Sequence, residues 1–176
     1  LLSRLAEQHR IHLEHDLHLA VSMRSFRADS ASAFVKALLD CEQGDASNYL
    51  HELGRRFPTA ITRSVDRAKD WIRSHARGSE RYGLVASSKA MRLKPHAIDV
   101  RVPINPVHWF LANQNDPRSS YFMEDAATEF QVQGLELDWV CVNWDADLRK
   151  SPKGWSYHDY RGDRWMNIKE PRNKTY

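Results

Sequence analysis

Four consecutive residues, Gln133, Gly134, Leu135 and Glu136, combine chemical groups that suit contact with a ligand. The Gln133 amide can both donate and accept hydrogen bonds, and the Glu136 carboxylate can accept them from a ribose hydroxyl. Gly134 allows the backbone to turn and to approach a ligand closely. The same pattern also fits a helix that ends at Gly134 before a buried strand, so spacing alone leaves both interpretations open.

A second set of polar side chains follows predicted strands directly. Ligands of open α/β sheets bind where strands reach their carboxyl ends, so hydroxyl and cationic side chains at these positions suit contacts with a sugar–phosphate backbone. The candidates are Thr62, Arg63, Ser87, Ser88, Lys89 and Thr128. Ordinary helix capping is the alternative role for each of these side chains.

Histidine and acidic residues cluster in two places without forming a metal-binding motif. Residues 12–18 contain three histidines but lack the His-Glu-x-x-His spacing of a helical zinc site. The acidic group could be imagined as the two-metal centre of a nuclease, and its members are Glu124, Asp125, Glu129, Glu136, Asp138, Asp145 and Asp147. A strand with Asp138 and Asp145 at its ends would separate their carboxylates by over ~20 Å at about 3.3 Å per residue, which argues against a shared centre. We expect no metal site from either group.

Aromatic and basic residues are interleaved near the end of the chain. The aromatic residues are Trp144, Trp155, Tyr157, Tyr160 and Trp165, and the basic ones are Arg149, Lys150, Lys153, Arg161 and Arg164. Such a mixture suits stacking on unpaired nucleotides. Aromatic residues of a hairpin more often pack against the parent core, and we favour packing here.

The elements that would position these residues alternate between strands and helices, which predicts an α/β fold with a mostly parallel sheet flanked by helices. Expected helices cover 1–14, a segment capped by Ser30 or Ser32, 46–53, a segment capped by Ser64, and 107–111. Expected strands cover 16–23, 57–62, 82–87, 98–102 and the run through Val142, and Pro95 should stop a helical turn over 88–93. Residues 155–160 and 164–168 alternate around Arg161-Gly162-Asp163, which predicts a β-hairpin. The chain would then consist of an α/β domain over 1–150 and a hairpin appendage with a tail over 151–176.

The composition is that of a folded domain. The chain has 176 residues, 41% of them hydrophobic, and six tryptophans, which is enough for one core. Its formal net charge of +3 permits an anionic partner without demanding one. No apolar run approaches the roughly 18 residues of a membrane helix, and Cys41 and Cys141 lack the spacing of a disulfide framework. We therefore expect a cytoplasmic protein with no membrane partner.

Several segments in order along the whole chain carry a family resemblance. They are 1–5, 19–27, 61–63, 81–95, 105–110, 128–140 and 161–165. Together they resemble a bacterial family of domains of unknown function that is grouped with the Schlafen group-3-like DNA/RNA helicase domain, among the superfamily 1-type P-loop helicases. The Gln-Gly-Leu-Glu core alone is a weak signal, whereas the ordered set is a strong one.

The resemblance implies a second RecA-like lobe of an ATP-dependent DNA/RNA helicase or translocase, which closes over ATP and grips the nucleic acid. The segment 128–140 resembles motif V, at the mouth of the ATP cleft, which makes Gln133, Gly134 and Glu136 the implied ATP contacts. The segment 19–25 resembles motif IV, whose arginine reaches the γ-phosphate. Arg24 matches that position best and Arg27 second, and a guanidinium is permanently charged and matches phosphate oxygens two at a time.

The other half of such an ATP site is not encoded in the chain. No glycine precedes a lysine, so the Gly-x-x-x-x-Gly-Lys-Ser/Thr loop is absent, as is an Asp-Glu-Ala-His-like Mg²⁺ motif. We interpret the chain as a fragment, and we expect ATP and Mg²⁺ to be bound mainly by a missing first lobe and the fragment alone not to hydrolyse ATP. The alternatives are a nucleic-acid-binding module without motor activity and a metal-dependent nuclease. The sequence does not indicate DNA or RNA, the direction of movement or the oligomeric state.

Overall fold

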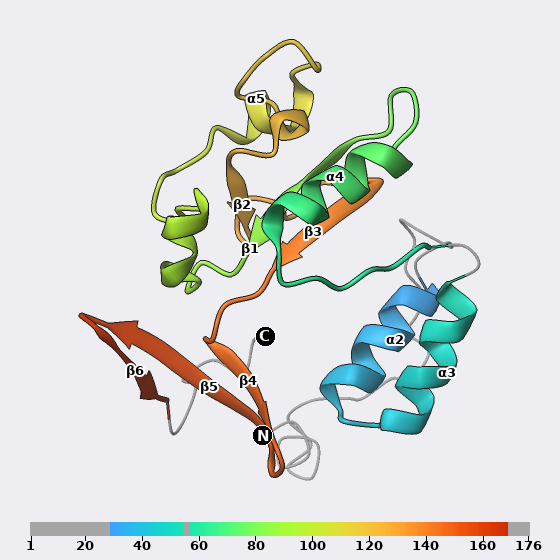
Figure 1. Cartoon of the computed structure of the whole chain (residues 1–176), viewed down its shortest axis with the longest axis vertical. Helices are drawn as coiled ribbons and strands as arrows, with labels where there is room; N and C mark the ends of the chain where they lie inside the picture. Colours follow the sequence, from blue (N-terminus) through green and yellow to red (C-terminus); the bar gives the residue numbers. More distant parts are fainter. Residues whose placement is uncertain (1–28, 55–56, 169–176) are drawn as a thin grey trace, which may run out of the picture. The chain divides into compact units, whose positions relative to one another are not determined.

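A computed structural model describes residues 29–54 and 57–168 of the chain, which divides into two compact units, Leu1–Thr59 and Ala60–Tyr176 (Figure 1). The predicted division at residue 150 falls inside the second unit, within a β-strand, and stays a prediction. No helix in the described ranges is long and apolar enough to cross a membrane.

The described part of the first unit is a pair of helices, α2 (Asp29–Leu39) and α3 (Gln43–Leu53), which pack against each other. Ala37 of α2 and Ala46 and Leu53 of α3 are buried. Both helices confirm the sequence prediction, although each begins earlier than expected. Ser30 and Ser32 consequently lie within α2 and do not precede it.

The centre of the second unit is a three-stranded parallel sheet in the order β2-β1-β3. Its strands are β1 (Tyr82–Ala86), β2 (Ala126–Thr128) and β3 (Trp139–Asn143). Leu84, in the middle of β1, pairs with Ala126 on one side and Cys141 on the other. The expected α/β class with parallel strands is therefore confirmed.

Helices cover both faces of this sheet. Successive side chains of each strand point to opposite faces and therefore pack against different helices. On one face, Leu84 and Ala86 join Ile72 of α4 (Val65–His75) in the main hydrophobic core. On the other, Gly83 faces Trp109 of α5 (Pro106–Leu111), which is 1% exposed. A Cβ at Gly83 would lie 2.7 Å from Cζ2 of Trp109, so this glycine is what allows the close contact.

An antiparallel sheet follows, made of β4 (Leu148–Ser151), β5 (Gly154–Arg161) and β6 (Arg164–Asn167). The turn between β5 and β6 is the predicted hairpin, with Gly162 at a φ of 67°. Tyr160 pairs with Trp165 across it, and their ring centroids are 5.1 Å apart. The hairpin prediction is confirmed, whereas β4 was not expected from the sequence.

Two expected strands are wrong, and so is one helix boundary. Residues 57–62 are irregular and exposed, and Ile61 is fully exposed, so this segment has no sheet to join. Residues 98–102 form turns, because Ala97 adopts a left-handed conformation that directs Ile98 into the core. Pro95 lies inside the 3₁₀ helix η2 (Met91–His96), which continues to His96 instead of stopping before the proline. The expected helix over 1–14 and strand over 16–23 lie outside the described residues.

Candidate nucleic-acid interface

The three parallel strands end at the same level. Ala86, the last residue of β1, pairs with Thr128 at the end of β2 and with Asn143 at the end of β3. We call the residues that end or directly follow these strands the carboxyl edge, and the opposite side of the sheet the amino edge. The carboxyl edge therefore brings Ser87, Ser88 and Thr128 together, as the sequence predicted for strand-end residues.

Ser88 is held by a carboxylate from the neighbouring strand end. Its backbone N–H donates to Oε2 of Glu129 at 2.8 Å, and its hydroxyl donates to Oε1 of the same residue at 2.6 Å. Hydrogen bonds to an ionised carboxylate are shorter and stronger than neutral ones. Both donors that Ser88 could offer to a phosphate are thus occupied, and Glu129 places a negative charge at the edge.

Lys89 brings a positive charge to the same edge. Its backbone N–H donates to the Ser87 hydroxyl at 3.1 Å, which fixes the turn after β1. Its ammonium lies 3.8 Å from Oδ1 of Asp159 in β5, a long ion pair between side chains that are 48% and 22% exposed. Lys89 therefore remains accessible to an anionic ligand.

Thr128 is closed off by its own turn. Oε1 of Gln131 accepts hydrogen bonds from the Thr128 backbone N–H at 2.8 Å and from its hydroxyl at 3.0 Å. The residue is 6% exposed. In this arrangement Thr128 shapes the end of β2 and exposes no hydroxyl group.

Thr62 and Arg63 precede α4 instead of ending a strand. The Thr62 hydroxyl accepts a hydrogen bond from the Ser64 backbone N–H at 3.1 Å, and Ser64 caps the helix by accepting from Arg67 N–H at 3.3 Å. Figure 1 shows α4 running antiparallel to β3, so the first turn of α4 points toward the carboxyl edge. Arg63 is exposed and comes two residues before this first turn.

Gln133, Gly134 and Glu136 lie on the connection that returns from the carboxyl edge to the amino edge. Gly134 has a φ of 81°, a conformation that favours glycine, and Gln133 and Glu136 are exposed. The connection reaches the amino edge at Asp138, whose Oδ2 accepts a hydrogen bond from Arg81 N–H, just before β1, at 2.7 Å. Gln133, Gly134 and Glu136 therefore come soon after Thr128 in the sequence but are not part of the carboxyl edge.

Arg24 and Arg27 lie outside the described residues, as does the histidine-rich segment 12–18. In the described ranges, no three His, Cys, Asp or Glu side chains are grouped so that they could hold a metal ion. Asp138 and Asp145 lie at opposite ends of β3, and Asp145 is engaged at its own end, where Oδ2 accepts from Arg92 N–H at 2.9 Å. This separation argues against a nuclease centre built on the two.

Sequence reasoning missed Asn143 at the end of β3, and it considered Trp144 and Asp145 only for base stacking and for a metal centre. Asn143 donates to the backbone carbonyls of Val85 and Cys141 and thereby joins β3 to β1. Asp145 is buried, and Trp144 between them is 53% exposed. Their position directly after a hydrophobic run was the available signal, and it is the same signal that identified Ser87 and Ser88.

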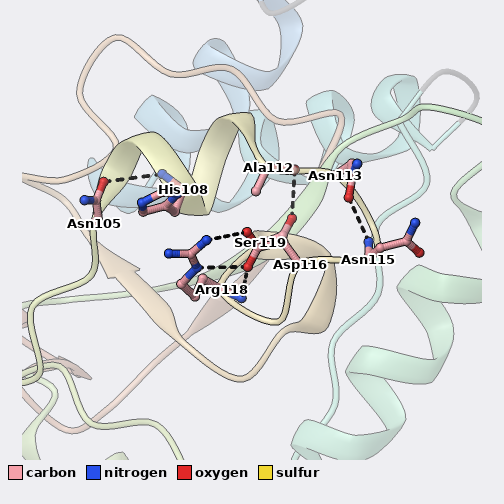
Figure 2. Close-up of polar contacts among 8 residues, drawn as sticks. All are labelled: Asn105, His108, Ala112, Asn113, Asn115, Asp116, Arg118 and Ser119. Carbon is pink, nitrogen blue, oxygen red and sulfur yellow. Dashed lines mark hydrogen bonds and ion pairs between the residues drawn. The ribbon is translucent and has the colours of Figure 1, made fainter.

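A polar loop after α5 lies near the amino edge (Figure 2). Asn105 caps α5, and the buried Ser119 hydroxyl donates to the Ala112 carbonyl at 3.0 Å. The Arg118 guanidinium donates twice to Asp116, from Nε at 3.0 Å and from Nη2 at 2.7 Å, and it lowers the pKa of Asp116 to about 2. The loop is ordered by its own side chains.

An open hollow of about 390 Å³ lies beside this loop. Its lining residues are Gly78, Ser79, Arg81, Asn113, Gln114, Asn115 and Tyr121. The Arg81 guanidinium donates to the Ala112 carbonyl at 3.0 Å and lies 4.5 Å from the centre of the Tyr121 ring. Arg81 therefore holds the loop and the strand start together, at the edge opposite the candidate interface.

A parallel sheet with helices on both faces and polar side chains where its strands end defines an α/β domain of the kind that binds ligands at strand ends. Within that class, the chain belongs to the family described as Schlafen group 3, DNA/RNA helicase domain, whose sequence model matches residues 1–175. The chain is accordingly a helicase-type domain with a role related to nucleic acid. Comparison with curated proteins and with solved structures found no match.

Proposed function

We propose that the chain is the second RecA-like lobe of a superfamily 1-type, ATP-dependent DNA/RNA helicase or translocase. The family match and the parallel α/β sheet support this proposal. The sequence has no Gly-Lys-Ser/Thr loop for ATP phosphates, so a partner lobe would supply it together with most contacts to Mg²⁺. The chain alone would then not hydrolyse ATP.

The carboxyl edge is the surface that we propose grips the nucleic-acid backbone. The observation that carries this assignment is the common level of the three strand ends, beside which the accessible ammonium of Lys89 lies. A cationic side chain positions a sugar–phosphate backbone without reading its bases. Lys89 and Arg63 are exposed cations that we assign to this surface, while Thr62, Ser87, Ser88 and Thr128 would shape it.

The ATP-facing role is assigned to the connection between β2 and β3. Exposed Gln133 and Glu136 on either side of Gly134 offer an amide and a carboxylate to a nucleotide held by the first lobe. Arg24 and Arg27 would reach the γ-phosphate, as their match to motif IV implies. ATP binding and nucleic-acid binding would thus meet on one short stretch of chain that begins at Thr128.

Binding of a fluorescent single-stranded oligonucleotide by the 176-residue chain tests the interface. Lys89→Ala and Arg63→Ala should each weaken binding several-fold and lower the slope of log K against log salt by about 1. Lys36→Ala on α2 removes the same charge from an exposed side chain and is the matched control. Variants that bind like this control would refute the assignment.

The motor assignment is tested with the protein that carries both lobes. Glu136→Ala and Gln133→Ala should lower ATP turnover stimulated by nucleic acid, while the chain alone should show no turnover. Hydrolysis by the chain alone, or unchanged turnover in both variants, would contradict the role. Cleavage of nucleic acid with Mg²⁺ or Mn²⁺ and without ATP, lost in Glu136→Ala and Asp138→Ala, would instead establish a nuclease.

A further inference from the structure

An aromatic pair with adjacent lysines lies where the parallel sheet passes into the antiparallel sheet. Trp144 directly follows β3 and is 53% exposed. Its ring centroid lies 6.0 Å from that of Trp155 in β5, and its Nε1 donates to the Leu148 carbonyl at 2.8 Å. The hydrogen bond and the ring contact hold the indole of Trp144 in place while leaving about half of the residue open to solvent.

Basic residues follow Trp144 in β4 and the turn after it, beyond Asp145, which is buried and paired with Arg92, and Asp147. Residues 148–155 contain three cationic side chains and no acidic one. The ammonium of Lys150 lies 5.9 Å from the centre of the Trp155 ring, and both Lys150 and Lys153 are exposed. Arg149 turns away to donate to the Ala146 carbonyl at 2.7 Å. The two lysines therefore supply the positive charge beside the aromatic surface.

This cluster adjoins the carboxyl edge. Trp144 lies one residue beyond Asn143, which pairs with the last residue of β1. From the end of β1, Lys89 reaches across to Asp159 in β5 at 3.8 Å. A strand of nucleic acid that crosses the carboxyl edge would thus meet Trp144 next to the end of β3.

We propose that Trp144 is a stacking platform for an unpaired base of single-stranded nucleic acid, with Trp155 supporting it and Lys150 and Lys153 contacting the flanking phosphates. An indole face stacks on any base, so the platform would bind without preference for a base sequence. The lysines would make binding dependent on salt concentration. The site lies outside the helicase motifs assigned above. It rests on the proposed function only in taking nucleic acid as its ligand.

The decisive experiment compares two fluorescent ligands of equal length and charge, an oligothymidylate and an abasic oligonucleotide. Trp144→Leu should bind the oligothymidylate about tenfold more weakly and the abasic ligand as the unaltered chain does, because base–aromatic stacking is worth on the order of 1–3 kcal/mol per base. Trp144→Phe, which keeps a ring but loses the hydrogen bond to Leu148, should retain most of the affinity. Equal binding of oligothymidylate by Trp144→Leu and the unaltered chain would overturn the proposal.

A purely structural role for Trp144 gives a different pattern, since weaker folding would reduce binding of both ligands alike. Photo-crosslinking of the unaltered chain with an oligonucleotide that carries 5-iodouracil provides a measurement without mutation. Crosslinks should map to Trp144 or Trp155, and their absence from both would overturn the platform. Lys89→Ala distinguishes the carboxyl-edge proposal from the stacking proposal, because it should weaken the binding of both ligands equally. If Lys89→Ala binds both ligands normally while Trp144→Leu binds the oligothymidylate weakly, the proposed grip by the carboxyl edge is refuted and the stacking role of Trp144 is retained.

Discussion

The two sheets of the second unit are stabilised in different ways. In the parallel sheet, Leu84 is fully buried and packs in a continuous core with Ile72 of α4 and with Ile98 from the turns after η2. In the antiparallel sheet, β5 is half-buried along its length except for its exposed last residue. Ring contacts such as that between Tyr160 and Trp165 stabilise it. The comparison shows that one sheet fixes positions by packing, whereas the other presents aromatic and cationic groups at a surface.

Arg92 joins the two sheets. Its backbone N–H donates to the buried carboxylate of Asp145, and its Nε lies 3.5 Å from the other oxygen of that carboxylate. Its guanidinium also lies 5.3 Å from the centre of the Trp165 ring, which Arg149 approaches to 5.2 Å. The antiparallel sheet is thus attached through cations and rings to residues that the parallel sheet holds in place.

Shortening a core leucine should give the largest effect and tests this difference most directly. Leu84→Ala removes a side chain that is 0% exposed, and the loss of packing should cost about 2–5 kcal/mol in the free energy of unfolding. Leu148→Ala in half-buried β4 should cost much less. Urea denaturation of both variants measures the difference, and equal losses would show that the two sheets are equally packed.

The next largest effect should come from the buried carboxylate that connects the sheets. Asp145→Ala removes the acceptor of the Arg92 and Ala146 backbone N–H groups, and leaving these part-buried donors unpaired should cost about 1 kcal/mol. Near-ultraviolet circular dichroism should also change, because Trp165 loses a fixed Arg92 beside it. Asp163→Ala, in the exposed turn between β5 and β6, is the control and should leave stability unchanged. If Asp145→Ala and Asp163→Ala have the same stability and the same near-ultraviolet spectrum, Arg92 does not connect the two sheets as described.

Local signals in the sequence were sufficient for several elements. Ser64 before an apolar helical pattern predicted α4, Pro106 at a helix start predicted α5, and the apolar run from Tyr82 predicted β1. The strand β2 has three residues, Ala-Ala-Thr, and its small side chains carry no periodic signal. It becomes a strand because β1 lies beside it, which no local pattern expresses.

The candidate site shows the same limit. Strand-end hydroxyls could be predicted from position, but their partners could not. Glu129 binds Ser88 across 41 residues of sequence, and Asp145 binds Arg92 across 53. Such pairs depend on the order and register of the strands, and the sequence indicated β1 and β3 without indicating β2 or which strands are neighbours. The expected strand at 57–62 failed for the same reason, because a strand needs a neighbour with which to form hydrogen bonds.

A smaller effect should come from the carboxylate at the carboxyl edge. If this edge and the aromatic cluster both contact nucleic acid, the negative charge of Glu129 opposes binding at the edge. Glu129→Gln removes the charge and keeps an oxygen that can accept from Ser88, so affinity for a single-stranded oligonucleotide should rise about fivefold, as expected for roughly 1 kcal/mol of repulsion. Glu52→Gln on α3 removes the same charge from an exposed position and is the control. Weaker binding by Glu129→Gln would mean that the carboxylate supports the grip by holding Ser88.

The smallest effect concerns an exposed ion pair of the loop beside the parallel sheet. The Asp116 carboxylate accepts two hydrogen bonds from the Arg118 guanidinium and one from its backbone N–H, whereas the same spacing in the antiparallel sheet joins Asp159 to Arg161 by one bond, at 3.1 Å. Arg118 lowers the pKa of Asp116 from 3.8 to about 2, so the folded loop favours the ionised form. The resulting stabilisation is present above about pH 4 and is lost as the pH falls through about 2.

An NMR titration of the Asp116 carboxyl group measures this directly. The midpoint should lie near 2 in the unaltered chain and return toward 3.8 in Arg118→Ala. The free energy of unfolding at neutral pH should change little, because exposed ion pairs are screened by solvent. A midpoint near 3.8 in the unaltered chain would show that the bidentate geometry is not maintained in solution. In that case the loop beside the parallel sheet would hold its charged groups no more firmly than the surface of the antiparallel sheet does, and the contrast between the two regions would be confined to their cores.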